Sequence, residues 1–459
     1  MNEVLLAKRN DKWEADINRR LDVEKSKDYY YDKQEGYLLA VLEENYPNSY
    51  KDMKPFCDYL NLTKSVTDQL SVLFESPPEV KIEKEGKLAE NFNDMVLESK
   101  LYPTLQKVNK YVNLTRKVGV MPHYDGKTSL EIITADKVFV EQDPMIPTKA
   151  NAVWVQIGIV TDTPHESDQV NKYIRWTAQT QQVIIVDNQS GLIKETLKEN
   201  PNPYGRIPIV WFTDDIEEDS FWFDSENYIV EKNEIFNQDL TALRFGATLQ
   251  SFSTLVLEGF EGKGDMKMGV HRPIIIPKND LGDASGKASY ITPDSDINAI
   301  YDYIDKRVIH VINSMGISAQ SYRSDASSFS SGYQLKLSKL DVIKKNKGDR
   351  QHYTESIKEL CQLMMQCVSL FDTKKRYPEN LNIEVDYAEI KFDEDPLQKE
   401  QVDASRLANG LTSRPRLLME RNPDLTLEDA IKLYKEIKAE NDEFGIGDKL
   451  EEFVEKDNE

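Results

Sequence analysis

The sequence predicts an α+β fold, because two hydrophobic periods occupy separate parts of the chain. Apolar residues recur every three or four positions over residues 225–257, 297–315 and 333–371, a pattern typical of amphipathic helices. Over residues 120–213 the period falls to two, which is typical of strands. At 459 residues the chain exceeds one hydrophobic core, so roughly two to four domains are expected.

The composition describes a soluble, acidic protein. The net charge is −22, the isoelectric point is near 4.8 and the mean hydropathy is −0.59. Such a surface repels nucleic-acid phosphates at long range, which argues against tight sequence-independent DNA binding by the bare chain. The N-terminus is charged, and no apolar run approaches the roughly 18 residues that span a bilayer. Synthesis in the cytoplasm without a membrane segment is therefore expected.

The first 75 residues are expected to be mostly helical, because apolar positions again follow helical spacing. Pro77 and Pro78 end this region, and residues 80–83 are expected to be extended. A further helix is expected over residues 87–118, with an interruption at Pro103.

A group of antiparallel strands follows, because short runs rich in Val, Ile, Trp and Thr alternate with turn dipeptides such as Asp125-Gly126 and Ser190-Gly191. The expected strands are residues 130–134, 138–141, 153–161, 173–178, 182–187 and 207–212.

Two long helices with a glycine-rich insert between them form the centre of the predicted organisation. Ser225 is expected to cap the first helix and Gly259 to end it, while Thr292 is expected to cap the second helix and Gly316 to end it. The insert, residues 261–291, is expected to hold a short strand between two prolines. A helical hairpin within one globular core is the alternative interpretation.

Residues 318–332 show no periodicity and consist mainly of small polar residues, so they are expected to form a loop. Composition leaves a functional loop and a disordered loop as equal alternatives. One long helix is expected over residues 333–371, with a bend at Gly348, because glycine costs about 1 kcal/mol relative to alanine in a helix. Lysines are frequent in its first half, where a solvated face is the alternative to a functional one.

The last part of the chain is expected to contain a strand at residues 381–392 and helices near residues 400–408 and 427–439. From residue 440 onward the sequence is acidic and is expected to be disordered.

Motifs for catalysis, metals and cofactors are not found. Cys57, Cys361 and Cys367 lack CxxC spacing, so buried free thiols are expected instead of a disulfide framework or a zinc site. Five widely separated histidines show no metal-binding pattern, namely His123, His165, His271, His310 and His352. The segment GDASGKAS at residues 282–289 differs from a phosphate-binding loop in the spacing of its glycines and lacks a hydroxyl residue directly after Lys287.

Several segments, in this order, resemble the portal proteins of tailed bacteriophages, in the branch typical of long-tailed phages of Gram-positive hosts. Near the start lie YLNLTKSVTDQLSVLFESPPEVKIE at residues 59–83 and LEIITADKVFVEQDP at residues 130–144. NPYGRIPIVWF at residues 202–212 is similar to the family's connection into its long helices. Residues 382–430 are similar to its segment of strand, proline, helix and G-L-x-S. Each match is moderate, and their order makes the resemblance specific.

The resemblance implies a portal fold with an α/β wing, a long-helix stem, a small β-containing clip, a tunnel loop, a long bent helix and a short helical crown. The implied divisions are wing 1–223, stem helix 224–260, clip 261–291, stem helix 292–316, tunnel loop 317–332, bent helix 333–371, return strand 372–396, crown 397–440 and acidic tail 441–459.

The resemblance also implies a ring, expected to have twelve subunits, at the portal vertex of the virion capsid, through which double-stranded DNA passes without sequence specificity. Implied partners are the terminase large subunit, a head-completion or adaptor protein, and the major capsid and scaffolding proteins, with no cofactor, no metal and no catalysis. DNA-facing tunnel-loop residues are expected to be Ser318, Gln320, Ser321, Tyr322, Arg323, Ser324, Ser327, Ser328, Phe329 and Ser330. Channel-lining basic residues are expected to be Lys336, Lys339, Lys344, Lys345 and Lys347. The clip docking surface is expected to include Lys263, Lys267, Arg272 and Lys278.

Two other functions stay open from the sequence. One is a nucleic-acid-handling ATPase that uses residues 282–289 as a degenerate phosphate loop. The other is a different structural subunit of the virion, such as a capsid or connector protein, although the long helices argue against a capsid shell.

Overall fold

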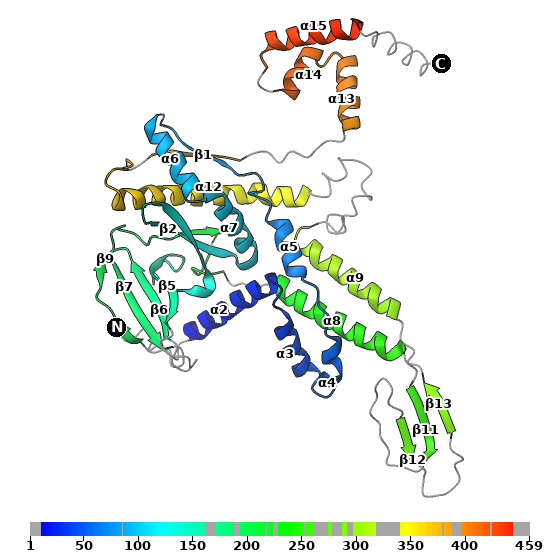
Figure 1. Cartoon of the computed structure of the whole chain (residues 1–459). Coiled ribbons are helices and arrows are strands. Elements are labelled where there is room, and N and C mark those ends of the chain that lie inside the picture. Colours follow the sequence, from blue (N-terminus) through cyan, green and yellow to red (C-terminus); the bar gives the residue numbers. More distant parts are fainter. Residues whose placement is uncertain are drawn as a thin grey trace. The chain divides into compact units, whose positions relative to one another are not determined.

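A computed structural model describes most of the chain as two compact units, and each unit is treated separately (Figure 1). The first unit comprises residues 1–323 and 339–390, and the second comprises residues 324–338 and 391–459. The described residues are 11–84, 86–160, 170–187, 193–216, 218–223, 228–251, 254–260, 274–277, 287–291, 297–317, 340–378, 381–387, 396–422 and 425–443.

The N-terminal region is helical, as predicted. Its elements are α2 (Asp11–Tyr30), α3 (Glu35–Asn45), α4 (Tyr50–Met53), the 3₁₀ turn η1 (Lys54–Phe56) and α5 (Leu62–Leu70). Asn61 caps α5, because its side-chain Oδ1 accepts a hydrogen bond from the Lys64 amide at 2.9 Å. Helix α5 buries Leu62, Val66 and Leu70, which explains the helical spacing of its apolar residues.

The prediction of one helix over residues 87–118 was wrong in two respects. The structure has two helices, α6 (Lys87–Glu98) and α7 (Leu101–Thr115), and the break is at Lys100, which adopts a left-handed conformation with φ 54°. Pro103 lies in the first turn of α7, where an amide hydrogen has no partner within the helix, so it does not interrupt the helix. The chain then enters strand β2 (Lys117–Tyr124), which the helix prediction had partly covered.

Outside residues 254–291, the described strands of the first unit are antiparallel, as predicted, and they form three sheets. Strand β1 (Glu79–Ile82) pairs with β14 (Ile383–Asp386), and β10 (Val210–Thr213) pairs with β2, which also pairs with β3 (Thr128–Thr134). The 3₁₀ turn η2 (Ala135–Lys137) leads from β3 into the third sheet. That sheet has the order β4 (Val138–Gln142), β5 (Ala150–Val160), β6 (Val170–Thr177), β7 (Thr180–Asp187) and β8 (Ile193–Thr196), and β9 (Asn200–Pro201) also pairs with β7. Strands β8 and β9 were not predicted.

The first long central helix is shorter than predicted. Helix α8 (Tyr228–Ser251) ends before the apolar run Thr254 to Leu257, which forms part of strand β11 (Thr254–Phe260). Alternation of β-branched and larger apolar residues allows this run to pair with β12 (Ile274–Pro277) in parallel and with β13 (Lys287–Ile291) in antiparallel orientation. The predicted strand at residues 274–276 is therefore confirmed, and it belongs to a three-stranded sheet.

Helix α9 (Ile297–Ser314) ends as predicted at Gly316, which has φ +74°. The Gly316 amide donates to the Asn313 carbonyl at 3.0 Å and the Ile317 amide donates to the Ile312 carbonyl at 3.2 Å. These two hydrogen bonds form a Schellman motif, which satisfies carbonyls that the helix end leaves without partners. Ile312 and Ile317 are both buried in the same apolar cluster.

Helix α12 (Leu340–Phe371) is the longest helix among the described residues and forms part of the main core. It contains Gly348 without interruption, and the predicted bend there stays a prediction. Its second half buries apolar residues in a cluster that also includes β2, β10, β1 and β14, the α12 members being Ile357, Leu360, Cys361, Leu363, Met364, Met365, Cys367 and Val368. Burial raises the pKa of the Cys361 thiol to about 12, so this thiol stays protonated, as expected for a free core cysteine.

The second unit contains three described helices, α13 (Pro396–Ala408), α14 (Arg414–Arg421) and α15 (Leu427–Glu443). Helix α14 was not predicted, and α15 continues to Glu443, beyond the expected end at residue 439. The Arg406 guanidinium donates to both carboxylate oxygens of Glu420, at 2.9 and 3.0 Å. This ion pair therefore joins α13 to α14.

Candidate functional site

A row of buried polar side chains on α8 holds an extended segment of the N-terminal region. Asn233, Asn237 and Thr241 have no exposed surface and lie at intervals of four residues. Together they hydrogen-bond the main chain of residues 58–63, so this arrangement is called the α8 ladder.

Each member of the α8 ladder has defined partners. Asn233 Oδ1 accepts from the Thr63 amide at 2.9 Å, and Asn233 Nδ2 donates to the Leu60 carbonyl at 2.8 Å. Asn237 Oδ1 accepts from the Leu60 amide at 3.0 Å. The Thr241 hydroxyl accepts from the Asp58 amide at 3.1 Å and donates to the Asp58 carbonyl at 3.0 Å. Main-chain groups of Asp58 and Leu60, which lie outside any helix or sheet, and the Thr63 amide in the first turn of α5 therefore have hydrogen-bond partners.

The spacing of the α8 ladder follows from the two backbone geometries. Four residues of an α-helix rise about 6 Å. Two residues of an extended chain span about 6.6 Å, so one step of four on α8 matches a step of two from Leu60 to Asp58. The ladder therefore depends on Asn or Thr at fixed helical positions, not on the hydrophobicity of the helix.

The first turns of α8 and the last turns of α9 are joined in one apolar cluster. The cluster, called here the root cluster, includes Ile229 and Val230 of α8, with partners from α2, α5, α9 and the first turn of α12. Those partners are Tyr29, Leu62, Val66, Leu70, Val311, Ile312, Ile317 and Val342. Further along the helix pair, Arg307 of α9 donates to Asp239 of α8 at 2.9 Å. The root cluster therefore attaches both central helices to the N-terminal region, and the ion pair joins the two helices to each other.

The first half of α12 is held by charged contacts in addition to the apolar packing of Val342. Lys345 Nζ donates to Asp349 Oδ2 at 2.7 Å and to Asn113 Oδ1 at 3.0 Å, and it lies 3.9 Å from Asp214 Oδ2. Arg116 also approaches Asp214 Oδ2, at 3.3 Å. Burial raises the pKa of Asp214, although Arg116 and Lys345 act in the opposite direction. Lys345 is therefore an integral part of the contact between α7, β10 and α12.

Only some of the predicted site residues lie within the described residues. Lys344 is exposed, with 67 % of its side chain accessible and Asp341 3.9 Å away, and Lys347 is exposed on the same helix. Lys345 has 30 % of its side chain accessible and is engaged as described above. The predicted tunnel-loop residues from Ser318 to Ser330, Lys336, Lys339, and the predicted docking residues Lys263, Lys267, Arg272 and Lys278 lie outside the described residues.

The position of Lys287 disagrees with a phosphate-binding loop. Lys287 is the first residue of strand β13 and pairs with Glu258 of β11. The lysine of a phosphate-binding loop lies instead where a loop enters a helix, so that helix amides face the phosphates. The ATPase alternative is therefore not favoured.

Metal binding finds no support in the part of the chain that the structure describes. Groups of three or more side chains able to hold a metal ion are absent there. His123 contacts the Glu131 carboxylate at 2.8 Å in a surface pair. Within the same described part, no helix combines the length and apolarity that a bilayer span requires.

The α8 ladder was missed by the sequence interpretation, which considered only apolar positions of the first central helix. A signal was present, because asparagine and threonine at intervals of four residues in an otherwise apolar stripe place polar groups on a buried face. Their partners were not predictable, since Asn233 and Thr63 are 170 residues apart.

The resemblance to phage portal proteins implied an α+β region that is attached to a pair of long helices. It also implied a small sheet that lies between these two helices in the chain, and the structure has both features. Comparison with known families agrees, because residues 9–443 match the family described as phage portal protein, SPP1 Gp6-like. The chain belongs to this family. Its members are structural, ring-forming proteins of the virion that associate with capsid and packaging proteins. A search of curated proteins gave no match.

Proposed function

We propose that this chain forms a ring of twelve subunits at one vertex of the capsid, through which double-stranded DNA enters during packaging and leaves during ejection. The observation that carries this proposal is the family match over residues 9–443. The helices α8 and α9, which the root cluster attaches to the N-terminal region, also support the proposal. A ring that directs DNA through a channel needs long helices that keep a fixed orientation.

The net charge of the chain fits a channel through which DNA passes better than a surface that binds DNA tightly. Twelve chains at −22 each carry −264 in total (12 × −22), which repels DNA phosphates. Local basic residues then reduce this repulsion at chosen positions. Lys344 and Lys347 suit that role among the described residues, because both are exposed. The proposal also includes Lys336, Lys339 and Lys345, and the loop hydroxyls with Arg323 as contacts to phosphates without base specificity.

The parts of the chain take the following roles in this proposal. The region up to residue 223 is the wing, helices α8 and α9 are the stem, and residues 261–291 form the clip. Residues 317–332 are the tunnel loop, and the helices of the second unit are the crown. The clip docks the terminase large subunit during packaging and a head-completion or adaptor protein afterwards, while the major capsid and scaffolding proteins contact the ring during assembly.

Electron microscopy of the purified protein tests the ring. Negative-stain images are expected to show closed rings with a central hole, and class averages give the subunit number. A monomer at all concentrations, even with capsid partners present, contradicts the proposal.

Deletion of residues 318–332 tests the tunnel loop. The variant is expected to assemble into the same rings but to package no DNA, because the loop acts on DNA and not on assembly. A variant that no longer forms rings would instead assign the loop a structural role.

A further inference from the structure

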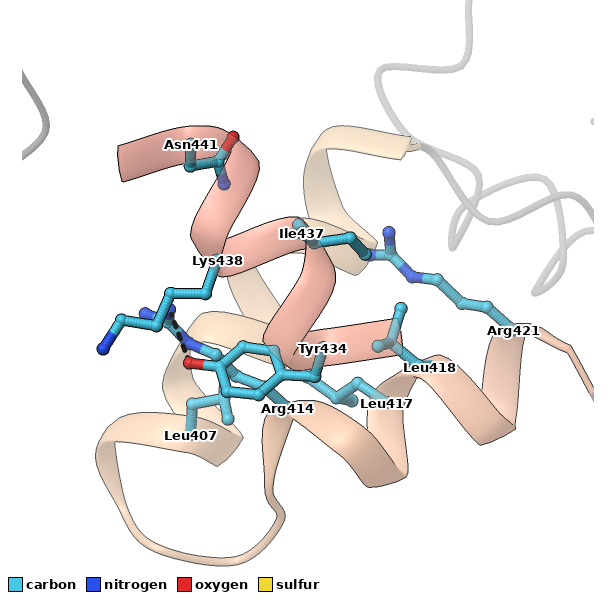
Figure 2. Close-up of a pocket in the computed structure, with 9 residues that line it drawn as sticks. All are labelled: Leu407, Arg414, Leu417, Leu418, Arg421, Tyr434, Ile437, Lys438 and Asn441. Carbon is cyan, nitrogen blue, oxygen red and sulfur yellow. Dashed lines mark hydrogen bonds between the residues drawn. The ribbon is translucent and has the colours of Figure 1, made fainter. Parts of the chain in front are cut away.

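The three described helices of the second unit surround a hollow of about 300 Å³ (Figure 2). Apolar side chains from all three helices line it, and basic side chains lie at its rim. The lining residues are Leu407, Arg414, Leu417, Leu418, Arg421, Tyr434, Ile437, Lys438 and Asn441.

The described helices bury too little apolar surface to form a complete core. Leu417 and Ala430 are the buried apolar residues among them. Several large apolar side chains of these helices and of the connection between α13 and α14 are exposed instead, at 37–73 % of their surface: Val402, Leu411, Leu427, Ile431 and Ile437. Units of this size are only marginally stable even with a filled core, so the hollow is a place where further apolar burial is needed.

The rim of the hollow is basic. Arg421 approaches Asp403 at 3.3 Å, and Arg414 donates to the Tyr434 hydroxyl at 3.4 Å (Figure 2). Lys438 has no carboxylate partner within 4.0 Å among the described residues. An apolar floor with a basic rim is complementary to a segment that combines apolar and acidic side chains.

We propose that residues 444–459 of the same chain occupy this hollow. Their sequence, FGIGDKLEEFVEKDNE, places Leu450, Phe453 and Val454 at intervals of three and four, suited to one apolar face. Six acidic residues and two lysines give the segment a net charge of −4, opposite to that of the rim. The apolar residues fill the floor, and the carboxylates pair with Lys438 and Arg414.

The segment has the length to reach the hollow. From Lys438 to Glu443, α15 rises about 7.5 Å. After a reversal at Gly445 and Gly447, which permit left-handed backbone, a helical segment from residue 448 to residue 454 rises about 9 Å. A chain that folds back along α15 therefore brings residues 450–454 to Lys438.

Cross-linking tests this placement in the full-length protein. The pair Lys438→Cys with Val454→Cys is treated with a short bismaleimide, and Glu436→Cys with Val454→Cys serves as the matched control. Glu436 lies two positions away, on the opposite face of α15 by its helical period. We expect the within-chain cross-link of the Lys438 pair to be at least about tenfold more abundant than that of the Glu436 pair. The reason is that a segment bound in the hollow stays on one face of α15, whereas an unbound segment reaches both faces equally. Equal yields for the two pairs, or cross-links found only between chains, would overturn the proposal.

Hydrogen exchange supplies an independent measurement. In the variant Leu450→Ser with Phe453→Ser, amides of α14 and α15 are expected to exchange about tenfold faster than in the unmodified protein, because the filled core protects them. The control, Lys449→Ser with Lys456→Ser, changes the same segment without removing apolar side chains and is expected to leave exchange unchanged. Protection of α14 and α15 that survives the apolar substitutions contradicts the proposal. Neither experiment depends on DNA or on ring assembly.

Discussion

Asn233 Oδ1 lies 2.9 Å from the Thr63 amide nitrogen and 3.0 Å from the Thr63 hydroxyl, and it thereby joins α8 to the start of α5. Both residues are fully buried. The same Asn233 side chain donates to the Leu60 carbonyl, so one amide group satisfies three polar groups of the extended segment. Because the root cluster lies beside this contact on α8, the α8 ladder determines how the helix leaves the N-terminal region.

Asn233→Ala is expected to lower the free energy of unfolding of the first unit by about 3 kcal/mol, because the buried amide and hydroxyl of Thr63 and the partly buried carbonyl of Leu60 lose their partner. Gln238→Ala is the matched control, since Gln238 accepts from Asn45 at an exposed position of the same helix, and its expected effect is below about 0.5 kcal/mol. Chemical denaturation followed by circular dichroism measures both. Similar losses for the two variants would show that the ladder has no special role.

Gly348→Ala is expected to stabilise the protein by about 1 kcal/mol, because Gly348 is exposed in a continuous helix and no atom lies within 4 Å of an added Cβ. Gly119→Ala provides the contrast, since its Cβ would lie 2.8 Å from Ile209 Cγ2 and 3.1 Å from the Trp211 ring. The free energy of unfolding of the Gly119→Ala variant is expected to fall by about 1–3 kcal/mol. Thermal unfolding compares the two. A destabilised Gly348→Ala variant would indicate that α12 needs the glycine for the predicted bend.

The Glu141 carboxylate is expected to make stability depend on pH. Burial raises the pKa of Glu141, but hydrogen bonds from Arg175, at 2.7 and 2.9 Å, and from Trp154, at 2.6 Å, lower it below the ordinary value. Because the pKa of Glu141 is lower in the folded protein, the stabilisation is fully present at pH values above its pKa in the unfolded chain, about 4.3. The stabilisation is lost as the pH falls through the pKa of Glu141 in the folded protein. Glu141→Gln is therefore expected to cost about 2 kcal/mol at pH 7 and much less at pH 3. A constant difference between the two proteins from pH 7 to pH 3 would contradict this assignment.

Lys344→Glu and Lys345→Glu are expected to differ, although the two lysines are adjacent. Lys345→Glu places a carboxylate beside Asp349 and Asp214. This substitution is expected to lower the free energy of unfolding by about 3 kcal/mol. Lys344→Glu changes an exposed side chain and is expected to have an effect within about 0.5 kcal/mol. DNA retention in assembled particles then reports on the proposed channel role, most clearly for Lys344→Glu because its folding is unaffected. Unchanged packaging and retention in that variant would favour a solvated surface.

Periodicity predicted the elements whose own residues determine them. The helical N-terminal region, α9 with its Gly316 end and the strands from β3 to β7 follow from local spacing and turn residues. Errors occurred where two periods meet. The run from Thr254 to Leu257 continues the spacing of α8 and also alternates, and pairing with β12 and β13 makes it a strand. Strand β2 is buried on both faces for most of its length, so it lacks the alternation that reveals a strand.

The contacts of the candidate site were less predictable than its elements. Lys345 and Lys344 look equivalent in the sequence, but helix rotation directs only Lys345 toward Asn113, which lies 232 residues away. A polar residue in a helix is usually solvated, so the buried positions of Asn233 and Asn237 depend on an extended segment that no local pattern identifies. Family resemblance supplied the role of the chain, and the structure supplied which side chains hold it together.

The pairing of β1 with β14 has a consequence for how the protein is made. Glu79 faces Asp386 and Ile82 faces Ile383, so this two-stranded sheet joins residues about 300 positions apart. While the ribosome is still synthesising the middle of the polypeptide, β1 has no neighbour, and its free edge is exposed to other nascent chains. Maturation of the first unit is therefore delayed until translation passes Asp386, and premature termination before that codon is expected to yield fragments that aggregate.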